Sequence, residues 1–339
     1  MASRNLSAPS IANPPGELPT AAAGPEFRAH ELILPPEAAG LRLDQALVRA
    51  LPQYSRARLA GWIAAGAVHV DGRTPRGRDR VLGGERVRIA ATLPARADVA
   101  PERLPLAVVY RDRALLVIDK PPGLVVHPGA GNPRHTLQNA LLALDPKLAC
   151  VPRAGLVHRL DKDTSGLLLV ARTPEAHAAL VAALAARTIT REYLALVNGV
   201  MTAGGTISAP IARHRTLRTR MAVRAGGRPA VTHYRVIRRF PAHTLVRLKL
   251  ATGRTHQIRV HLAHIGFPIV GDRVYGGRPR APRGASPELA AALRGFPRQA
   301  LHAARLALTH PLTGRELALE APLPQDMRRL LAALEAQRP

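Results

Sequence analysis

The apolar residues alternate between helical and strand spacing in short segments along two stretches of the chain, residues 41–93 and 106–335. Residues 94–105, which contain proline and alanine, separate the two stretches and have the composition of a linker. Residues 1–35 show no apolar periodicity, and we expect a disordered leader there. Helices and strands are mixed, with several hairpin-type connections. The sequence therefore predicts an α+β protein whose second stretch forms a largely antiparallel mixed sheet flanked by helices and loops.

The first stretch has the pattern of two short helices followed by a small sheet. Apolar residues recur at helical spacing over residues 43–51. Ser55 is suited to cap a second helix, and Gly66 is suited to end it in a left-handed conformation. Apolar residues then alternate at 68–70 and at 87–89, which is typical of short strands.

The charge of the chain indicates a polyanionic partner. Lys and Arg number 49 against 23 Asp and Glu, so the net charge is +26. Such a field attracts RNA, although a halo of solvated arginines would give the same sum. With 47% apolar residues the chain is a folded protein and not a basic tail. One later segment is typical either of a loop that contacts phosphates or of a solvated run, through Arg213, Arg215, Arg218 and Arg220.

Several classes of protein are excluded by what the sequence lacks. A single cysteine, Cys150, cannot form an internal disulfide or a thiolate metal site. No apolar run approaches the ~20 residues of a membrane span, and no signal peptide precedes the first stretch, so we expect a cytoplasmic protein. No P-loop is present, and we expect no nucleotide cofactor. The spacing of His256, His261 and His264 permits a metal site, but no carboxylate accompanies them and we expect none.

The most polar short segment between apolar runs is residues 157–167, where Asp161 lies between Arg159 and Lys162. Nearby cations favour the ionised form of a carboxyl group, and an ionised carboxylate suits a nucleophile or a general base. The alternative is a salt-bridged turn in which aspartate and serine side chains cap backbone groups. The segment is therefore a candidate catalytic loop.

A second polar segment covers residues 252–266. Three apolar residues between 258 and 265 lie at helical spacing, so the segment predicts a helix that Thr255 caps and Gly266 ends. Arg259 falls on a face adjacent to this apolar stripe. Its guanidinium group can therefore reach a partner beside the core.

Three short segments of the first stretch resemble the S4 RNA-binding module, namely residues 42–44, 55–56 and 66–72. In that family a pair of helices presents basic residues to structured RNA. The resemblance therefore implies a small S4-like α/β RNA-binding domain over residues 41–93, and the alternative is another small helical docking domain. The residues that it implies for RNA contact are Arg42, Ser55, Arg56 and Arg58.

Residues 41–335 together resemble the RluA family of RNA pseudouridine synthases. The most specific likeness is the segment His158-Arg159-Leu160-Asp161, which is followed by Ser165-Gly166. The chain departs from the family in its leader and in its near absence of lysine, and neither departure touches this motif. The resemblance implies a pseudouridine synthase fold in residues 106–335.

The resemblance also implies a reaction and the residues that perform it. The enzyme would isomerise uridine in RNA without a cofactor, with Asp161 as the nucleophile. Attack at ribose C1′, a route through a glycal after proton loss and attack at uracil C6 all stay open. Arg259 would keep the Asp161 carboxylate ionised and oriented, and Tyr193 would stack on the uracil. Arg159 would fill the gap left by a flipped-out base. Further candidates for contacts with phosphates or with the reacting loop are Lys120 and Lys162.

The implied substrate is 23S rRNA of the large ribosomal subunit, at uridines of the helix 69 hairpin, and the implied protein is a monomer. Two rival hypotheses remain. The first is a catalytically silent RNA-binding factor in ribosome assembly that uses the same basic surface. The second is a metal-dependent nuclease that uses Asp161 and Asp163 as ligands of magnesium.

Overall fold

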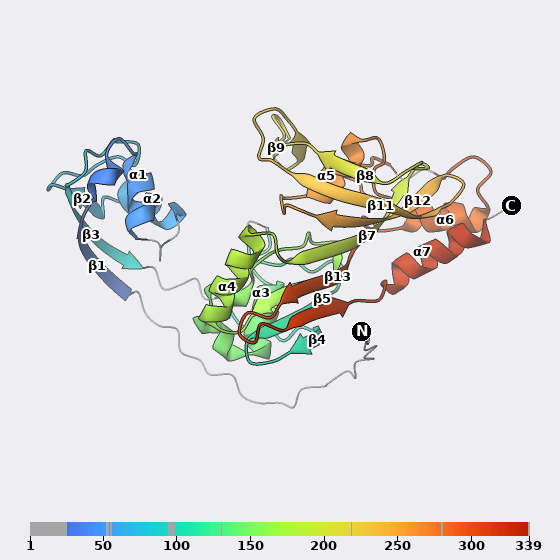
Figure 1. Cartoon of the computed structure of the whole chain (residues 1–339), viewed down its shortest axis with the longest axis horizontal. Coiled ribbons are helices and arrows are strands. Elements are labelled where there is room, and N and C mark those ends of the chain that lie inside the picture. Colours follow the sequence, from blue (N-terminus) through green and yellow to red (C-terminus); the bar gives the residue numbers. More distant parts are fainter. Residues whose placement is uncertain are drawn as a thin grey trace. The chain divides into compact units, whose positions relative to one another are not determined.

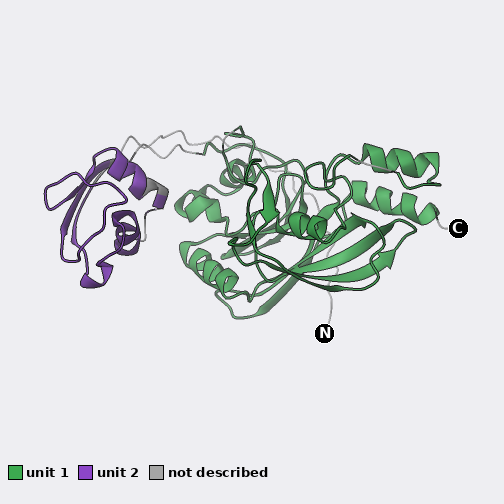
Figure 2. Ribbon diagram, turned by 90° about the horizontal axis from the view of Figure 1, so that it is seen from above, with its two compact units in different colours: residues 1–12, 99–339 green, residues 13–98 purple. Residues whose placement is uncertain are grey.

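The computed structural model describes residues 26–51, 54, 56–93, 99–129, 131–217, 219–278 and 281–337. It divides into two compact units, and the described residues of the larger unit begin at Val99 (Figure 2). Each unit has its own hydrophobic core and is described by itself. None of the helices in these residues has the length and apolar character of a membrane span.

The smaller unit is an antiparallel sheet with two short helices (Figure 1). Its described strands lie in the order β1 (Glu26–Ile33), β3 (Arg86–Leu93) and β2 (Val68–Val70). The helices are α1 (Leu43–Ala50) and α2 (Arg56–Ala64), and a 3-10 turn, η1 (Pro36–Ala38), follows β1. Leu47, Leu59 and Trp62 bury the apolar faces of both helices in one core with β3. The predicted helices and the strands β2 and β3 are thus confirmed.

Strand β1 differs from the expected leader over residues 1–35. Residues 26–33 pair with β3 along the whole length of β1. The sequence of β1 mixes charged and apolar residues without a clean alternation, so its strand character depends on hydrogen bonds from a partner more than fifty residues later in the chain. Leu34, also part of the predicted leader, is fully buried, and residues 1–25 lie outside the described residues.

The larger unit is built on one sheet, which has nine strands over its described residues. The order is β4-β5-β6-β13-β7-β12-β11-β8, and β14 pairs with β13. Among these strands only β6 and β13 are parallel, so the predicted, largely antiparallel mixed sheet is confirmed. The bounds of the strands are β4 (Ala107–Arg111), β5 (Leu115–Lys120), β6 (Ser165–Ala171), β7 (Thr190–Asn198), β8 (Gly205–Ser208), β11 (Val231–Arg239), β12 (His243–Leu250), β13 (Leu301–Thr309) and β14 (Glu316–Glu320).

Helices and one hairpin complete the larger unit. The hairpin pairs β9 (Ile211–Arg213) with β10 (Met221–Val223) outside the main sheet. Thr173 caps α4 by accepting a hydrogen bond from the backbone N–H of Ala176. The bounds are α3 (Leu137–Leu144), η2 (Pro146–Cys150), η3 (Pro152–Gly155), α4 (Pro174–Ala185), α5 (Gln257–His264), α6 (Pro287–Gly295) and α7 (Gln325–Ala336).

Helix α5 begins one residue later than its sequence suggests. His256, and not Thr255, is the residue that precedes the first helical turn, and it has a left-handed backbone with φ 56°. This conformation is rare for a residue other than glycine, and histidine tolerates it better than β-branched threonine does. The predicted end of the helix is confirmed, because Gly266 is left-handed with φ 84°.

Gly166 lets β6 and β13 approach each other directly after the polar loop 157–164. Its φ is +109°, and a Cβ atom at this position would lie 2.3 Å from the carbonyl oxygen of Ala303 in β13. One residue earlier, the Ser165 hydroxyl lies 3.0 Å from Nδ1 of His302. The polar loop therefore ends on a strand pair whose separation is fixed by backbone contact.

We expect Gly166→Ala to destabilise the protein by at least about 3 kcal/mol, because a Cβ atom would both overlap β13 and occupy an unfavourable backbone region. The matched control is Gly266→Ala, whose Cβ would have no atom within 4 Å although its φ is also positive. The control should cost only about 1 kcal/mol. Denaturant unfolding of both variants measures the difference, and equal losses would contradict the close strand pair.

Candidate active site

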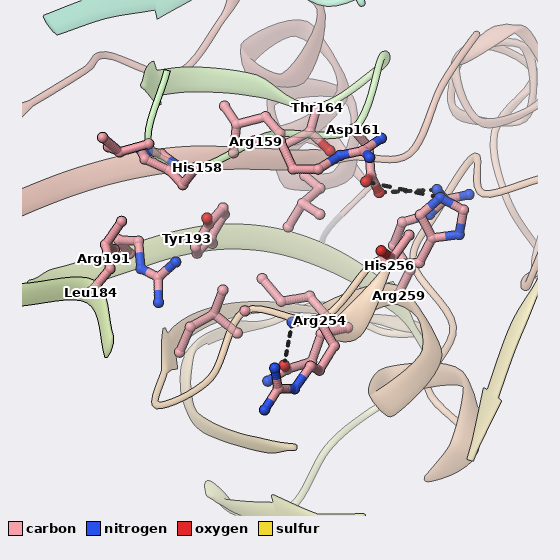
Figure 3. Close-up of a pocket in the computed structure, with 18 of the residues that line it drawn as sticks. His158, Arg159, Asp161, Thr164, Leu184, Arg191, Tyr193, Arg254, His256 and Arg259 are labelled. Atoms are coloured by element: carbon pink, nitrogen blue, oxygen red, sulfur yellow. Dashed lines mark hydrogen bonds and ion pairs between the residues drawn. The ribbon is translucent and has the colours of Figure 1, made fainter. Parts of the chain in front are cut away.

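The polar loop 157–164, strand β7 and the start of α5 surround a cavity of about 350 Å³ (Figure 3). Asp161, Tyr193 and Arg259 all line it. These three residues come from three separate parts of the sequence. The sheet therefore brings together the three residues that the sequence singled out for catalysis.

One oxygen of the Asp161 carboxylate accepts a hydrogen bond from Arg259, and the other faces His256. Nη1 of Arg259 donates to Oδ2 of Asp161 at 3.1 Å. The other oxygen, Oδ1, lies 3.9 Å from Nε2 of His256. The side chain of Asp161 keeps 17% of its surface exposed, so solvent or a bound molecule can reach it.

A second carboxylate fixes the Arg259 side chain. Nε and Nη2 of Arg259 donate to the two oxygens of Asp272 at 2.7 and 2.9 Å, which is a two-pronged ion pair. Its guanidinium carbon also lies 5.0 Å from the centre of the Tyr275 ring. Although burial opposes charge, the hydrogen bonds and charges of Asp272 and Asp161 raise the pKa of Arg259. The group is permanently cationic and has little freedom to turn away from Asp161.

Buried cations on two sides fix the backbone of the polar loop. Nη1 of Arg298 donates to the carbonyl oxygen of Asp163 at 3.1 Å, while its other nitrogens bind the Asp326 carboxylate at 2.6 and 2.8 Å. On the other side, Nζ of Lys120 donates to the carbonyl oxygen of Lys162 at 2.9 Å. The loop thus holds its conformation through main-chain contacts that do not involve the Asp161 side chain.

Lys120 does not lie where a nucleic acid could touch it. Its side chain is fully buried, and its ammonium group also donates to the carbonyl oxygens of Pro121 and Leu124 at 2.7 and 2.9 Å. Burial lowers the pKa of this lysine to about 7. Of the two contacts expected for Lys120, the one with phosphate is therefore wrong, whereas the residue does contact the polar loop, from inside. Lys162 is exposed, as a contact residue must be.

Tyr193 lies on β7 between β12 and β13, opposite Leu248 and Ala303. It is almost fully buried, yet it lines the cavity. Burial raises the pKa of its phenol, so the hydroxyl group is neutral near pH 7. The sheet therefore presents a fixed aromatic side chain in the cavity wall.

Two polar residues in the same wall were not singled out from the sequence. The backbone N–H of Leu169 donates to Nε2 of His158 at 3.0 Å, so the ring proton of this histidine sits on Nδ1. Burial and, to a smaller extent, nearby Arg191 lower the pKa of His158 to about 3. Nδ1 of His158 and Nε of Arg191 have no partner among the described residues. In the view of Figure 3, Tyr193 lies between these two residues and Asp161.

The predicted RNA-contacting residues fall into three groups. Arg159 is exposed and lines the cavity. The arginine-rich segment joins β9 to β10, and its described members are the exposed Arg213 and Arg215 and the half-buried Arg220. In the smaller unit, the largely exposed side chains of Arg42 and Arg56 pair with Asp44 at 3.0 and 2.8 Å. Outside the described residues lie Arg218, Ser55 and the side chain of Arg58.

The three histidines of the second polar segment do not converge. His261 is buried and bonds to Thr232 Oγ1 and to the carbonyl oxygen of Ala209, both at 2.9 Å. His264 is exposed, and His256 faces the cavity. In the described part of the chain, no three His, Cys, Asp or Glu side chains are grouped so that they could hold a metal ion.

Asp272 and Tyr275 complete the site and were also not singled out from the sequence as site residues. Both lie in the loop after α5, where no periodicity relates them to Arg259. The signal that could have found Asp272 is a lone aspartate that only Gly271 separates from the apolar pair Ile269-Val270, because an acidic residue beside a buried run needs a cationic partner.

We expect Lys120→Met to lower the free energy of unfolding by about 3 kcal/mol, because three carbonyl oxygens lose the donor that the buried ammonium group supplies. The matched control is Lys249→Met, which removes an exposed lysine from β12 and should change stability by less than about 0.5 kcal/mol. Urea unfolding of both variants checks this. A cost for Lys120→Met no larger than that of the control would contradict the role of Lys120 in closing the loop.

Comparisons with known proteins agree with this geometry. The family model described as RNA pseudouridylate synthase matches residues 114–264, and the S4 domain model matches residues 41–87. The chain is 55% identical to the ribosomal large subunit pseudouridine synthase D of Xanthomonas campestris pv. campestris over 90% of this chain and 92% of that protein. It is 56% identical to the protein of the same name from Yersinia pestis over 88% of this chain and 92% of that protein.

Solved structures give the same assignment. The human RNA pseudouridylate synthase domain containing 4 aligns with a TM-score of 0.54 and 29% identity over 68% of this chain and 93% of its own. The human RNA pseudouridylate synthase domain containing 1 aligns with a TM-score of 0.50 and 29% identity over 68% of this chain and 95% of its own. With its sheet, its S4 domain and its close relatives taken together, the chain belongs to the RNA pseudouridine synthase family, as its resemblance to the RluA enzymes predicted.

Proposed function

We propose that this RNA pseudouridine synthase acts on uridines of large-subunit rRNA, with Asp161 as its nucleophile. The substrate class is supported by the relatives, which carry the name ribosomal large subunit pseudouridine synthase D. The observation that supports Asp161 as the nucleophile is the position of its carboxylate group. Arg259 holds one oxygen at 3.1 Å, and the side chain faces a cavity that also contains Tyr193.

The reaction breaks the bond between uracil N1 and ribose C1′, turns the base and joins C5 of uracil to C1′. C5 then loses its proton and N1 gains one, so the product is an isomer of the substrate. An ionised carboxylate can add covalently to the substrate and leave again, which splits the exchange into two steps. Attack at C1′, elimination to a glycal and attack at uracil C6 all start from this carboxylate. The cation of Arg259 supports the ionised form and orients it in each case.

Tyr193 is suited to hold the uracil while it turns. Its ring is fixed by the sheet on both sides, and a flat aromatic surface stacks on a base without fixing the rotation of that base. The pKa of the phenol is raised by burial, so the hydroxyl group stays protonated. In this proposal Tyr193 stacks on the uracil and its oxygen is available when the C5 proton is lost.

Arg159 is suited to the opening of the RNA. It is exposed at the rim of the cavity, in the same loop as Asp161. A base that takes part in chemistry must leave the stack, and a planar guanidinium group can fill the gap that it leaves. Arg159 is only two residues before Asp161. A base that Arg159 displaces from the RNA would therefore arrive close to Asp161.

Two basic surfaces would bind the rest of the RNA. The smaller unit contributes Arg42 and Arg56, and the β9–β10 hairpin contributes Arg213, Arg215 and Arg220. The partner that we propose is 23S rRNA of the large ribosomal subunit, bound by a monomer in the cytoplasm, where ribosomes are. Uridines of the helix 69 hairpin remain our prediction for the modified positions.

We expect Asp161→Asn to abolish tritium release from C5-labelled uridine in large-subunit rRNA while RNA affinity stays near that of the wild type, because the amide is a poor nucleophile. The assay is run in EDTA on free rRNA and on assembled subunits. Full activity of this variant would disprove the nucleophile assignment. Loss of wild-type activity in EDTA would favour the metal-dependent nuclease, and RNA binding without release would favour the silent assembly factor.

Deleting residues 1–95 should weaken RNA binding and reduce its dependence on salt, because each phosphate contact that is lost removes one released counterion. The measurement is the dissociation constant for rRNA over a series of salt concentrations. A variant with the charge reversals Arg42→Glu and Arg56→Glu serves as the control with the unit still present. Unchanged affinity and salt slope in both proteins would contradict RNA binding by the smaller unit.

A further inference from the structure

His256 is a polar residue of the cavity to which the proposed mechanism gives no task. It lies at the start of α5 in a left-handed conformation with φ 56°. Such a conformation is strained for a residue other than glycine and persists where the surroundings hold the residue in place. The conformation brings the ring between Tyr275 on one side and Asp161 on the other, at distances of 2.8 and 3.9 Å.

The hydrogen bonds around Tyr275 decide which nitrogen of His256 carries the proton. The backbone N–H of Met221 donates to the Tyr275 hydroxyl oxygen at 2.9 Å. That oxygen already accepts a hydrogen bond, and its own proton is then free to be donated to Nδ1 of His256, which lies 2.8 Å away. Nδ1 is therefore an acceptor, and the neutral ring carries its proton on Nε2, the nitrogen that faces Oδ1 of Asp161.

This chain of contacts begins in the arginine-rich hairpin. Met221 is the first residue of β10, directly after the segment that contains Arg215 and Arg220. The Tyr275 ring packs edge-on against His256, with 5.7 Å between the ring centres, and it also lies against the Arg259 guanidinium. A displacement of the hairpin would therefore change the position of the Tyr275 ring through its hydrogen bond to Met221. It would then change the position of the His256 ring beside Asp161 through the hydrogen bond between the two rings.

We propose that His256 is a positioning residue for Asp161, held with its Nε2–H toward the carboxylate by Tyr275 and by the backbone of the β9–β10 hairpin. The inference rests on the proposed function of Asp161. Because the hairpin is also a proposed RNA contact, binding of RNA there would help to set the orientation of the nucleophile. A movement of about 1 Å would bring Nε2 of His256 within hydrogen-bond distance of Oδ1, as catalytic contacts tighten when substrate binds.

Because charged groups surround His256, its protonation should change the reaction rate and so be detectable in a profile of rate against pH. The polar loop presents Asp161 and Arg159, helix α5 presents Arg259, and the following loop presents Asp272 and Tyr275. Burial lowers the pKa of His256, so the ring is neutral near pH 7. Protonation would place a cation against the nucleophile and would turn Nδ1 into a donor that conflicts with the Tyr275 hydroxyl proton.

The test measures single-turnover tritium release and RNA affinity for full-length variants, with a large-subunit rRNA transcript as the probe. His256→Asn keeps a side chain that tolerates the left-handed backbone but is too short to face Asp161. Its rate should fall by roughly 10- to 100-fold, because misplacement of a reacting group by about 1 Å has effects of this size. RNA affinity should stay within about 3-fold, because phosphate contacts dominate it.

Tyr275→Phe keeps the ring and removes only the donor to Nδ1. The pKa of His256 should then rise, because the hydrogen bond that favours the neutral ring is lost, and the acidic limb of the rate profile should move to higher pH. Tyr110→Phe is the matched control. It also removes one hydroxyl group. Tyr110 lies on β4 and does not line the cavity, and its hydroxyl donates to Asp112 at 2.6 Å. Its rate and pH profile should match those of the wild type.

The outcomes separate this inference from the proposed function. If wild type is active and Asp161→Asn is inactive, but His256→Asn and Tyr275→Phe behave like Tyr110→Phe, His256 does not position Asp161 and the proposed function stands. A slower Tyr275→Phe with an unmoved acidic limb would also overturn the inference, because the tyrosine would then act through packing alone. An inactive wild type would overturn both. Thermal unfolding of each variant confirms that the compared proteins are folded.

Discussion

The buried ion pair between Arg259 and Asp272 is the interaction on which the active-site geometry depends. The two side chains are 7% and 0% exposed, so either one alone would carry a desolvation cost of several kcal/mol. Two short hydrogen bonds join them, and the backbone N–H groups of Val274 and Tyr275 donate to the same carboxylate. With two nitrogens committed in this way, the third can only point toward Asp161. A lysine could not make these contacts at once, because it lacks the planar fork.

Around the polar loop, one set of residues fixes the backbone and another faces the cavity. Its backbone is tied down by Lys120 and Arg298, which bind carbonyl oxygens from two sides, and its end is fixed where Gly166 meets β13. Rigidity is thus supplied by main-chain contacts of buried cations, while the Asp161 side chain keeps access to the cavity. This arrangement suits a nucleophile that must hold its orientation while a base turns in front of it.

Much of the fold followed from local pattern. Periodic apolar residues identified α1, α2 and α5 and the strands β2 and β3, because a helix or strand that buries one face must repeat its apolar residues at a fixed spacing. Strand β1 was not predicted from the sequence, because it is held as a strand by its hydrogen bonds to β3. The later strands and helices α6 and α7 were not identified from the sequence, since short segments of mixed polarity are compatible with several structures until a neighbour is placed beside them.

The sequence by itself determined the residue types of the site: a polar loop with Asp161, an aromatic Tyr193 on a strand, and Arg259 beside an apolar helix stripe. Only the tertiary structure decided what each of them does beside its neighbours. The tertiary structure places Lys120 in the interior, away from phosphates. It also pairs Arg259 with Asp272 and His256 with Tyr275 through hydrogen bonds. The reason is physical: periodicity records whether one side chain meets core or solvent, whereas a hydrogen bond between distant residues requires the backbones of both to be fixed in space.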